Sequence, residues 1–245
     1  MENKVKPSLL LLPGTLCTEA LFAPQFTALA EVADVCIRPL LKGKTVAACA
    51  AATLQDVPGR FALVGHSQGG LVALEIMRQA PERVSRLCLI STNPRGSTEQ
   101  NLDTWARWQR EARAGGFTEI IRFYLDHVAN KEGREKVQAV VTAMAQATGP
   151  ETFLSQLEML KSRTDSCPTL HKISCPTLLL GGEQDRVTPP ELQREMARLV
   201  PHANSTELAA CGHYAPLERP RRVATALCTW LSNEAGNGAC RVADA

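Results

Sequence analysis

Ser67 is the residue whose surroundings most clearly suggest chemistry. The sequence over positions 65–69 is Gly-His-Ser-Gln-Gly, so glycines stand two residues before and after the serine. An apolar run over residues 61–64 predicts a strand before this motif, and an amphipathic pattern predicts a helix after it. A serine on so sharp a turn exposes its hydroxyl at a helix N-terminus, where backbone N–H groups favour developing negative charge. This context predicts a nucleophilic serine.

The motif alone is weak evidence, because glycine and serine are common residues. At about 7% of residues each, Gly-x-Ser-x-Gly should occur by chance in roughly one chain of this length in ten. A tight strand-to-helix turn with packing glycines is the alternative interpretation. The two interpretations are separated by whether the chain also supplies the partners that a catalytic serine needs.

A serine hydroxyl becomes a good nucleophile when a base removes its proton and a third group orients that base. Around a turn of this kind, the chain order is serine, then a carboxylate, then histidine. Asp185 comes shortly after an apolar run and two glycines, and His213 follows the last expected strand and a glycine. Asp185 is favoured over Glu183, which comes earlier in the same turn. His213 is favoured over His202, which precedes the last expected strand.

Composition argues against several other functions. The chain has 245 residues, of which 44% are hydrophobic, and a net charge of +2 with scattered basic residues. These values favour neither nucleic acid nor a membrane surface as a partner. The histidines lack metal-ligand spacing, and no phosphate-binding Gly-x-x-x-x-Gly-Lys loop occurs. We therefore expect a small-molecule substrate, no cofactor and no metal, and we leave monomer or homodimer open.

The nine cysteines are an odd number without Cys-x-x-Cys spacing, and several lie in apolar runs. This pattern favours reduced thiols in a cytoplasmic protein. The apolar run near the N-terminus stops at Pro13, too early for a secretory signal, and favours a buried strand. Cys17 and Cys211 fall near the expected site and are most simply packing residues, with a cysteine nucleophile the less favoured alternative.

Short apolar segments alternate with helical patterns, which predicts a doubly wound, mostly parallel α/β sheet. The expected strands lie at residues 5–12, 34–40, 61–64, 86–92, within 175–185, and at 205–209. Besides the helix after Ser67, helices are expected over 23–31, 45–54, 189–199 and 221–231.

The alternation stops between about residues 98 and 163, where only helical patterns occur. They predict helices over 102–114, 117–128, 135–148 and 151–161. Six of the eleven aromatic residues lie in this segment, which suits a lid over a pocket, although most of them are expected to pack the lid itself. The expected organisation is a core of residues 1–96 and 168–232, a helical cap of residues 97–167, and a C-terminal tail of residues 233–245.

Four motifs, in order, resemble the α/β-hydrolase family, in its branch of small capped esterase-like and carbon–carbon-bond hydrolases. They lie at residues 11–15, 65–70, 181–189 and 212–220, and the resemblance spans roughly residues 8–231. It implies that Ser67 is the nucleophile, His213 the general base and acid, and Asp185 the carboxylate that orients His213. Many members begin with a hairpin, for which this chain has too few residues, so we expect about six parallel strands.

The resemblance also implies an oxyanion hole made of two backbone N–H groups. One belongs to Gln68. The other belongs to the residue after the glycine of a His-Gly-x motif that the family usually has here. This chain has Pro13-Gly14-Thr15 at that place, so the second donor is expected to be Thr15, with Leu16 as the alternative.

Substrate contacts are the least determined part of the sequence. Arg95 is expected near the rim of the pocket, and either it or a cap arginine is a candidate to bind a substrate carboxylate. A solvated helix face is the favoured explanation of the cap arginines, Arg107, Arg110 and Arg113. The other candidate substrate contacts are Leu16, Trp105 and Trp108.

The expected activity is hydrolysis of a small carboxylic ester, thioester or lactone through an acyl-serine intermediate. Two alternatives stay open. The same triad serves in carbon–carbon-bond hydrolases and lyases, and some proteins of this fold are non-catalytic receptors for small molecules.

Overall fold

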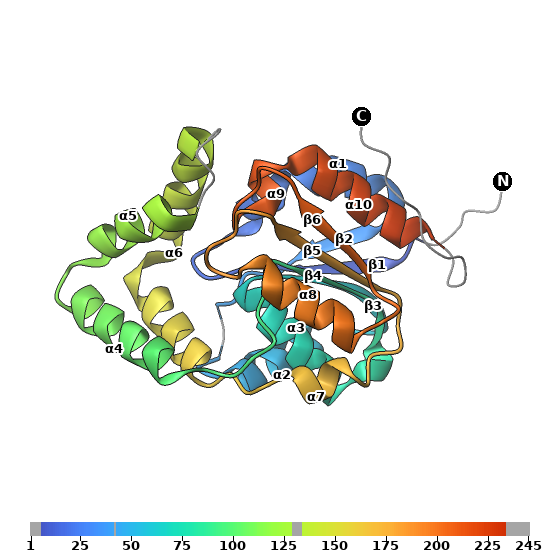
Figure 1. The fold of residues 1–245 in the computed structure, drawn as a ribbon, viewed down its shortest axis with the longest axis horizontal. Helices are drawn as coiled ribbons and strands as arrows, with labels where there is room; N and C mark the ends of the chain where they lie inside the picture. Colours follow the sequence, from blue (N-terminus) through green and yellow to red (C-terminus); the bar gives the residue numbers. More distant parts are fainter. Residues whose placement is uncertain (1–5, 42, 129–133, 234–245) are drawn as a thin grey trace.

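The computed structural model describes residues 6–41, 43–128 and 134–233 (Figure 1). Within them, six strands form one sheet in the order β2-β1-β3-β4-β5-β6, and all neighbouring strands are parallel. The strands are β1 (Ser8–Leu12), β2 (Asp34–Ile37), β3 (Phe61–His66), β4 (Val84–Ile90), β5 (Thr177–Gly182) and β6 (Asn204–Leu208). The expected six-stranded parallel sheet is therefore confirmed.

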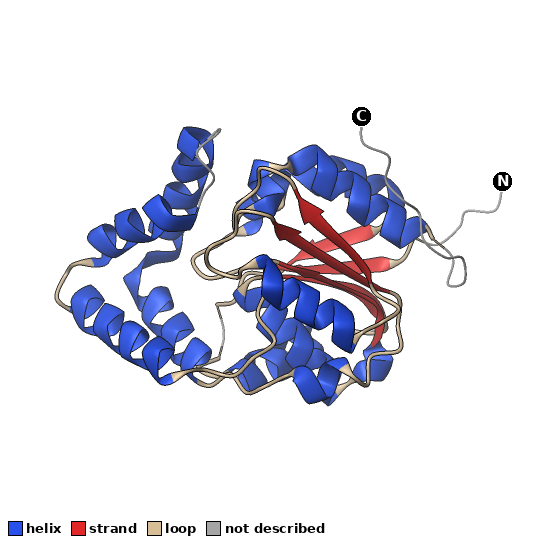
Figure 2. Ribbon diagram, viewed as in Figure 1, coloured by secondary structure: helices blue, strands red, loops and turns tan. Residues whose placement is uncertain are grey.

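Helices cover both faces of the sheet (Figure 2). On one face, α1 (Ala23–Val32) packs against α10 (Pro220–Ser232), and on the other lie α2 (Val46–Asp56), α3 (Gln68–Gln79) and α8 (Pro190–Leu199). This two-sided covering is the doubly wound arrangement predicted from the alternating pattern. No helix in the described ranges is long and apolar enough to span a membrane.

The leucine run of β1 shows why its sequence is almost continuously apolar. Leu9 and Leu11 point into the core beneath α1 and α10, while Leu10 and Leu12 point into the core beneath α2 and α3. Because successive side chains of a strand alternate between faces, a strand buried on both sides needs apolar residues throughout. β2 ends at Ile37, short of residue 40, and Arg38 makes the last backbone hydrogen bond to β1, with the Leu11 carbonyl oxygen at 2.9 Å.

Three of the helices between β4 and β5 lie beside the sheet and are shown in green and yellow in Figure 1. We call them the cap helices; they are α4 (Glu99–Arg113), α5 (Phe117–Val128) and α6 (Arg134–Lys161). α6 joins the two helices expected over 135–148 and 151–161. They meet at a kink, where Gly149 has a φ of 78° and Pro150 follows it.

Four short helical turns were not expected from the sequence, because they are too short to show a periodic pattern. They are η1 (Glu19–Leu21), η2 (Pro81–Arg83), α7 (Cys167–Leu170) and α9 (Ala215–Glu218). Residues 234–245, most of the expected C-terminal tail, lie outside the described residues.

The parallel sheet brings the segments of interest to one edge. Ser67 directly follows β3, the Asp185 loop follows β5, and the His213 loop follows β6. The loop that holds Thr15 follows β1, the neighbour of β3. The carboxyl ends of parallel strands share one edge of a sheet, so these loops meet there.

Candidate active site

Ser67 sits on a strained turn between β3 and α3. Its φ of 52° and ψ of −117° lie in a region that residues other than glycine rarely adopt. A Cβ on Gly69 would lie 2.1 Å from the carbonyl oxygen of Leu12, so only glycine fits there. Thr92, two residues after β4, donates a hydrogen bond from Oγ1 to the Ser67 carbonyl oxygen at 2.7 Å. The turn is held from both sides, and the serine side chain is held at the start of α3.

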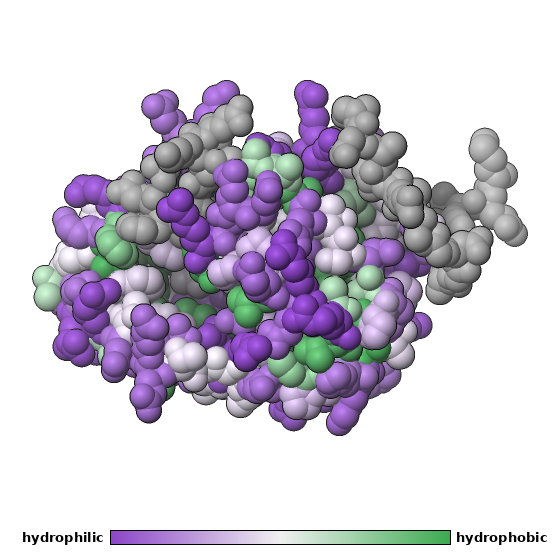
Figure 3. Space-filling model, viewed as in Figure 1, coloured by the Kyte–Doolittle hydropathy of each residue, from purple (hydrophilic) through white to green (hydrophobic). Residues whose placement is uncertain are grey.

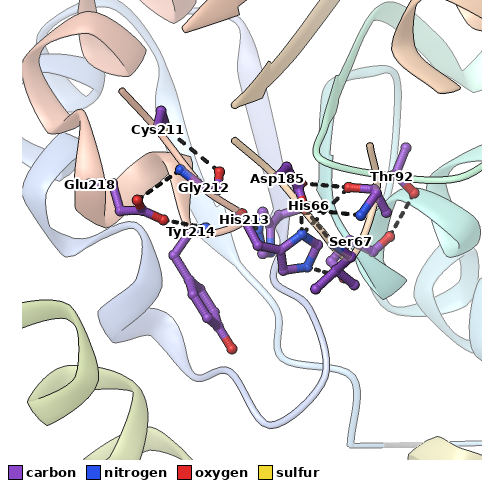
Figure 4. A network of polar contacts seen from close by, with 11 residues as sticks. His66, Ser67, Thr92, Asp185, Cys211, Gly212, His213, Tyr214 and Glu218 are labelled. Carbon is purple, nitrogen blue, oxygen red and sulfur yellow. Dashed lines mark hydrogen bonds and ion pairs between the residues drawn. The ribbon is translucent and has the colours of Figure 1, made fainter. Parts of the chain in front are cut away.

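The structure brings Ser67, His213 and Asp185 into one chain of contacts (Figure 4). The Nε2 atom of His213 lies 3.0 Å from the Ser67 Oγ, and its Nδ1 lies 2.9 Å from the Asp185 Oδ2. Both distances are within hydrogen-bonding range, as base and orienting carboxylate require. His213 and Asp185 are both buried.

The Asp185 carboxylate is held by its own loop. Oδ1 accepts hydrogen bonds from the backbone N–H groups of Val187 and Thr188, at 2.8 and 2.9 Å. Oδ2 accepts one from the Thr188 hydroxyl at 2.6 Å. Burial alone would raise the pKa of Asp185, but the charge of His213 and the hydrogen bonds from His213 and Thr188 lower it to about 2. The carboxylate is therefore charged at neutral pH.

The competing acid and base lie elsewhere. Glu183 accepts a hydrogen bond from the backbone N–H of Ala210, and His202 contacts the carbonyl oxygen of Cys175 from an exposed position. Burial raises the pKa of Cys17 to about 12 and that of Cys211 still further, so both thiols stay protonated. The cysteines of the described chain are all free thiols.

Two buried side chains fix the loop that carries His213. Glu218 accepts hydrogen bonds from the backbone N–H groups of Gly212 and Tyr214, at 2.8 and 2.9 Å, on either side of the histidine. Burial and the nearby His213 lower the pKa of His66 to about 3, so its ring is neutral. The His66 Nε2–H donates to the His213 carbonyl oxygen at 2.9 Å. His213 is thus held through its main chain as well as its ring.

The Thr15 loop packs directly against Ser67, since a Cβ on Gly14 would lie 3.0 Å from the Ser67 Cβ. Thr15 donates from Oγ1 to the Gln68 side-chain carbonyl at 2.8 Å, which ties the loop to the start of α3. In the described part of the chain, the backbone N–H groups of Thr15 and Gln68 have no protein acceptor. Leu16, with a φ of 55°, instead donates its N–H within the protein.

The acceptor for Leu16 is Gln156, a buried residue of α6. Its Oε1 accepts from the Leu16 N–H at 2.8 Å, and its backbone carbonyl accepts from the Gln68 side-chain amide at 2.8 Å. Its own amide donates to the Leu40 carbonyl oxygen at 3.2 Å. We call this set of contacts the Gln156 clamp. It fastens a cap helix to both segments that flank Ser67.

A cavity of about 260 Å³ opens beside Ser67, between the core and the cap helices. Among the expected substrate contacts, Leu16, Trp105 and Trp108 line it. Many other lining side chains are apolar: Leu71, Ile120, Ile121, Leu125, Val141, Ala145, Phe153, Leu157, Leu160 and Val187. The face seen in Figure 3 is mainly hydrophilic, with smaller hydrophobic patches. The cap therefore provides much of the wall of a pocket.

Arg95 does not line this cavity. Its guanidinium pairs with the Glu195 carboxylate at 2.7 and 2.9 Å, and 62% of its side chain is exposed. Arg107, Arg110 and Arg113 also lie outside the lining, on the exposed face of α4. The arginines that the sequence suggested as substrate contacts are therefore not brought to the cavity beside Ser67.

Several residues around the site were missed by sequence reasoning. Thr188 and Glu218 stand inside the motifs at 181–189 and 212–220, so their positions gave a signal. Gln156 and Arg163, which also lines the cavity, occur in cap segments with no motif. Their partners are far away in the sequence, and only the folded chain reveals them. Among the described residues, no cluster of His, Cys, Asp and Glu has the arrangement of a metal site.

Comparison with known proteins places this chain in a family. The model of the alpha/beta hydrolase family matches residues 11–226. The chain belongs to the alpha/beta hydrolase family. The resemblance seen in the sequence is therefore confirmed.

Relatives of this hydrolase include named esterases. It is 30% identical over 175 residues to the pimeloyl-[acyl-carrier protein] methyl ester esterase of Nitrosomonas europaea, covering 68% of this chain and 69% of that protein. It is 26% identical over 200 residues to the biotin biosynthesis bifunctional protein of Teredinibacter turnerae, covering 73% of this chain but only 34% of that longer protein.

One solved structure is similar to this chain over nearly its whole length. This is a thermophilic esterase from Thermogutta terrifontis, in a malate-bound form, with a TM-score of 0.83 and 25% identity. The match covers 93% of this chain and 90% of the esterase. Family membership and these esterase relatives identify the chain as an enzyme of the hydrolase type.

Proposed function

We propose that this hydrolase cleaves a small carboxylic ester, thioester or lactone through an acyl intermediate on Ser67. The observation that carries the proposal is the continuous set of contacts from the Ser67 Oγ through both nitrogens of His213 to Asp185, at the wall of an apolar cavity. An ester needs a nucleophile, a base that can return its proton, and space for the acyl and alcohol parts. The site offers each of these.

In the proposed mechanism, His213 takes the proton of the Ser67 hydroxyl at Nε2 as Oγ attacks the ester carbonyl carbon. The negative charge on the resulting oxyanion is met by the free N–H groups of Gln68 and Thr15. Thr15 is preferred to Leu16 because the Leu16 N–H is already bound to Gln156. Collapse of the intermediate expels the alcohol, which receives the proton from Nε2.

The second half of the reaction uses the same groups. A water molecule gives its proton to His213 Nε2 and attacks the acyl carbon, and the acid product leaves as Ser67 recovers its proton. Throughout, Asp185 holds the proton on His213 Nδ1 and stabilises the positive charge that the ring acquires. The low pKa of Asp185 keeps this carboxylate charged while His213 is protonated.

Pre-steady-state kinetics tests the acyl-serine intermediate directly. With a panel of p-nitrophenyl esters, we expect for at least one ester a burst of about one equivalent of p-nitrophenol, because deacylation by water is slower than acylation of an activated ester. Intact-protein mass spectrometry during the steady state should show the acyl group, and peptide mapping should place it on Ser67.

Two outcomes would favour the alternatives. Turnover of esters without any trapped acyl group would point to a triad that acts only as a base, as in carbon–carbon-bond cleavage. No turnover of any ester, with tight binding of small ligands by Ser67→Ala, would point to a receptor.

Loosening the Gln156 clamp should slow catalysis without weakening substrate binding. Gln156→Leu removes the acceptor of the Leu16 N–H, so the neighbouring Thr15 N–H is no longer held against Ser67. Losing one oxyanion donor costs 10²–10³ in kcat, and misplacing one should cost about 10- to 100-fold. Because Gln156 does not line the cavity, KM should change little. Steady-state kinetics with one p-nitrophenyl ester checks this split.

Gln146→Leu is the matched control, since Gln146 is an exposed residue of the same helix. It should leave both constants close to those of the parent enzyme. If Gln156→Leu lowers only the melting temperature, with kcat per folded molecule unchanged, the clamp serves stability and does not position the oxyanion hole.

A further inference from the structure

The cavity beside Ser67 holds one charged side chain among the described residues that line it. This is Arg163, which follows α6 at the base of the cap. Two uncharged polar residues of α4, Asn101 and Thr104, line the cavity too, while most of the remaining cap residues there are apolar. A single cation in an apolar pocket sets a strong preference for the charge of the ligand, because the surroundings screen it poorly.

The Arg163 guanidinium has neutral neighbours. Its Nη2 donates to the Asn101 Oδ1 at 2.9 Å and to the Gly96 carbonyl oxygen at 3.3 Å, and its Cζ lies 5.2 Å from the centre of the Trp105 ring. Its Nε is buried without a hydrogen-bond partner, and no ion pair joins it to a carboxylate of the described chain. Burial lowers the pKa of the Arg163 guanidinium, with no neighbouring charge to offset it.

Other arginines of this protein show what is unusual here. Arg95 pairs with Glu195, Arg78 with Glu75, and Arg194 with Glu207, each through two hydrogen bonds to a carboxylate. All three are largely exposed, where an ion pair contributes little. Arg83, Arg86 and Arg219 bind backbone carbonyl groups, but they do not line the cavity. Arg163 is the described arginine that lines it, and its hydrogen-bond partners are neutral.

We infer that Arg163 binds a carboxylate of the substrate, so that the preferred ester carries an apolar body and an acidic group away from the bond that is cleaved. This inference rests on the proposed function and names its substrate class. It moves the role suggested by the sequence for Arg95 to a residue that shares the cavity with Ser67. The Arg163 Cζ lies over the ring of Trp105, which also lines the cavity.

Binding to Ser67→Ala tests the inference without needing turnover. The probes are monomethyl adipate, which carries one carboxylate, and two neutral analogues, dimethyl adipate and methyl adipamate. Isothermal titration calorimetry should show about 10- to 100-fold tighter binding of the acid, as a charge-assisted hydrogen bond from arginine provides. A series of monomethyl esters from succinate to suberate then finds the chain length that spans the cavity. Equal affinity for acid and neutral probes across this series overturns the inference.

Variants assign the preference to Arg163. In the Ser67→Ala background, Arg163→Met should abolish the preference for the acid, since methionine keeps the apolar contact with Trp105 but has no charge. Arg163→Lys keeps the charge and should retain part of the preference, which covers the case in which Arg163→Met does not fold. Arg95→Met is the matched control and should retain all of it. Loss of the preference in Arg95→Met, or its full retention in Arg163→Met, also overturns the inference.

Kinetics of the active enzyme separates this inference from the proposed function. If the enzyme hydrolyses esters, its preference is the ratio of kcat/KM for an acid ester to kcat/KM for a neutral ester. This ratio should fall about 10- to 100-fold in Arg163→Met and stay constant in Arg95→Met. A purely structural Arg163 would lower both values equally, which contradicts the inference. If no ester is hydrolysed but the calorimetric preference persists, the carboxylate site stands and the proposed chemistry falls.

Discussion

Replacing Ser67 by alanine should lower kcat for ester hydrolysis by about 10⁴- to 10⁶-fold, the range seen when a triad nucleophile is removed. The change deletes only the hydroxyl that lies 3.0 Å from His213 Nε2. The Gln68 and Thr15 N–H groups and the cavity remain, so the variant should still bind substrate. Stopped-flow kinetics should show no burst, and calorimetry should show a Kd close to the KM of the parent enzyme where acylation is slow.

Ser91→Ala is a matched control for this variant. Like Ser67, Ser91 has a positive φ, 47°, and directly follows a strand of the sheet. It is buried, and its hydroxyl has no hydrogen-bond partner in the described chain. Removing that hydroxyl breaks no hydrogen bond and does not change the lining of the cavity, so kcat should stay within about twofold. A Ser67→Ala enzyme that keeps more than a few per cent of its activity would exclude Ser67 as the nucleophile.

Asp185→Asn should reduce kcat by about 10⁴-fold, the effect known for an aspartate that orients a catalytic histidine. Asparagine fits the space, but it brings no charge to stabilise a protonated His213. The backbone N–H groups of Val187 and Thr188 donate to Oδ1 of the carboxylate, and the Thr188 hydroxyl donates to Oδ2. Both positions therefore favour an oxygen over an NH₂ group. The amide NH₂ therefore has no good orientation, and the histidine is left without its acceptor at Nδ1.

Glu183→Gln separates the two acids of this turn, because Glu183 contacts the backbone of Ala210 and not His213. Its kcat should stay close to that of the parent enzyme. If instead Glu183→Gln is the inactive variant, the orienting carboxylate has been misassigned. Steady-state kinetics of both variants over a range of pH gives the comparison.

The charge of Asp185 also links stability to pH. Its folded pKa of about 2 is lower than the ordinary value of about 3.9, so its charge favours the folded state above the unfolded pKa. This contribution should be lost as pH falls from about 4 through the folded value. Asp185→Asn should therefore flatten this part of a plot of unfolding free energy against pH.

The sequence was sufficient to predict the sheet and the segments at its edge. β1 and β3 are apolar over nearly every residue, and the glycines around Ser67 and before Asp185 mark the turns where these strands end. Thr45, expected near a helix N-terminus, does cap α2 by accepting a hydrogen bond from the Ala48 N–H at 3.0 Å. Such features depend on neighbours in the chain, so they can be predicted from local pattern.

Contacts between the cap and the core could not be predicted in this way. Gln156 meets Leu16 across 140 positions of sequence, and its own neighbourhood predicts only a helix. The sequence suggested Arg95 as a residue near the pocket and gave no signal for Arg163. In the structure, Arg95 pairs with Glu195 of α8, whereas Arg163 lines the cavity and contacts Asn101 of α4, and both outcomes depend on how distant elements are placed.

One cap helix, α6, both lines the cavity and holds the loop beside Ser67. α6 contributes Phe153 and Leu157 to the wall of the cavity, and between them Gln156 holds the loop beside Ser67. A substitution that reshapes the wall to admit a different substrate therefore shifts the residue that sets the reaction rate. We expect substrate range and turnover to evolve together in this helix. Changes of specificity that leave the rate intact should instead arise in α4 and α5, which lie outside the clamp.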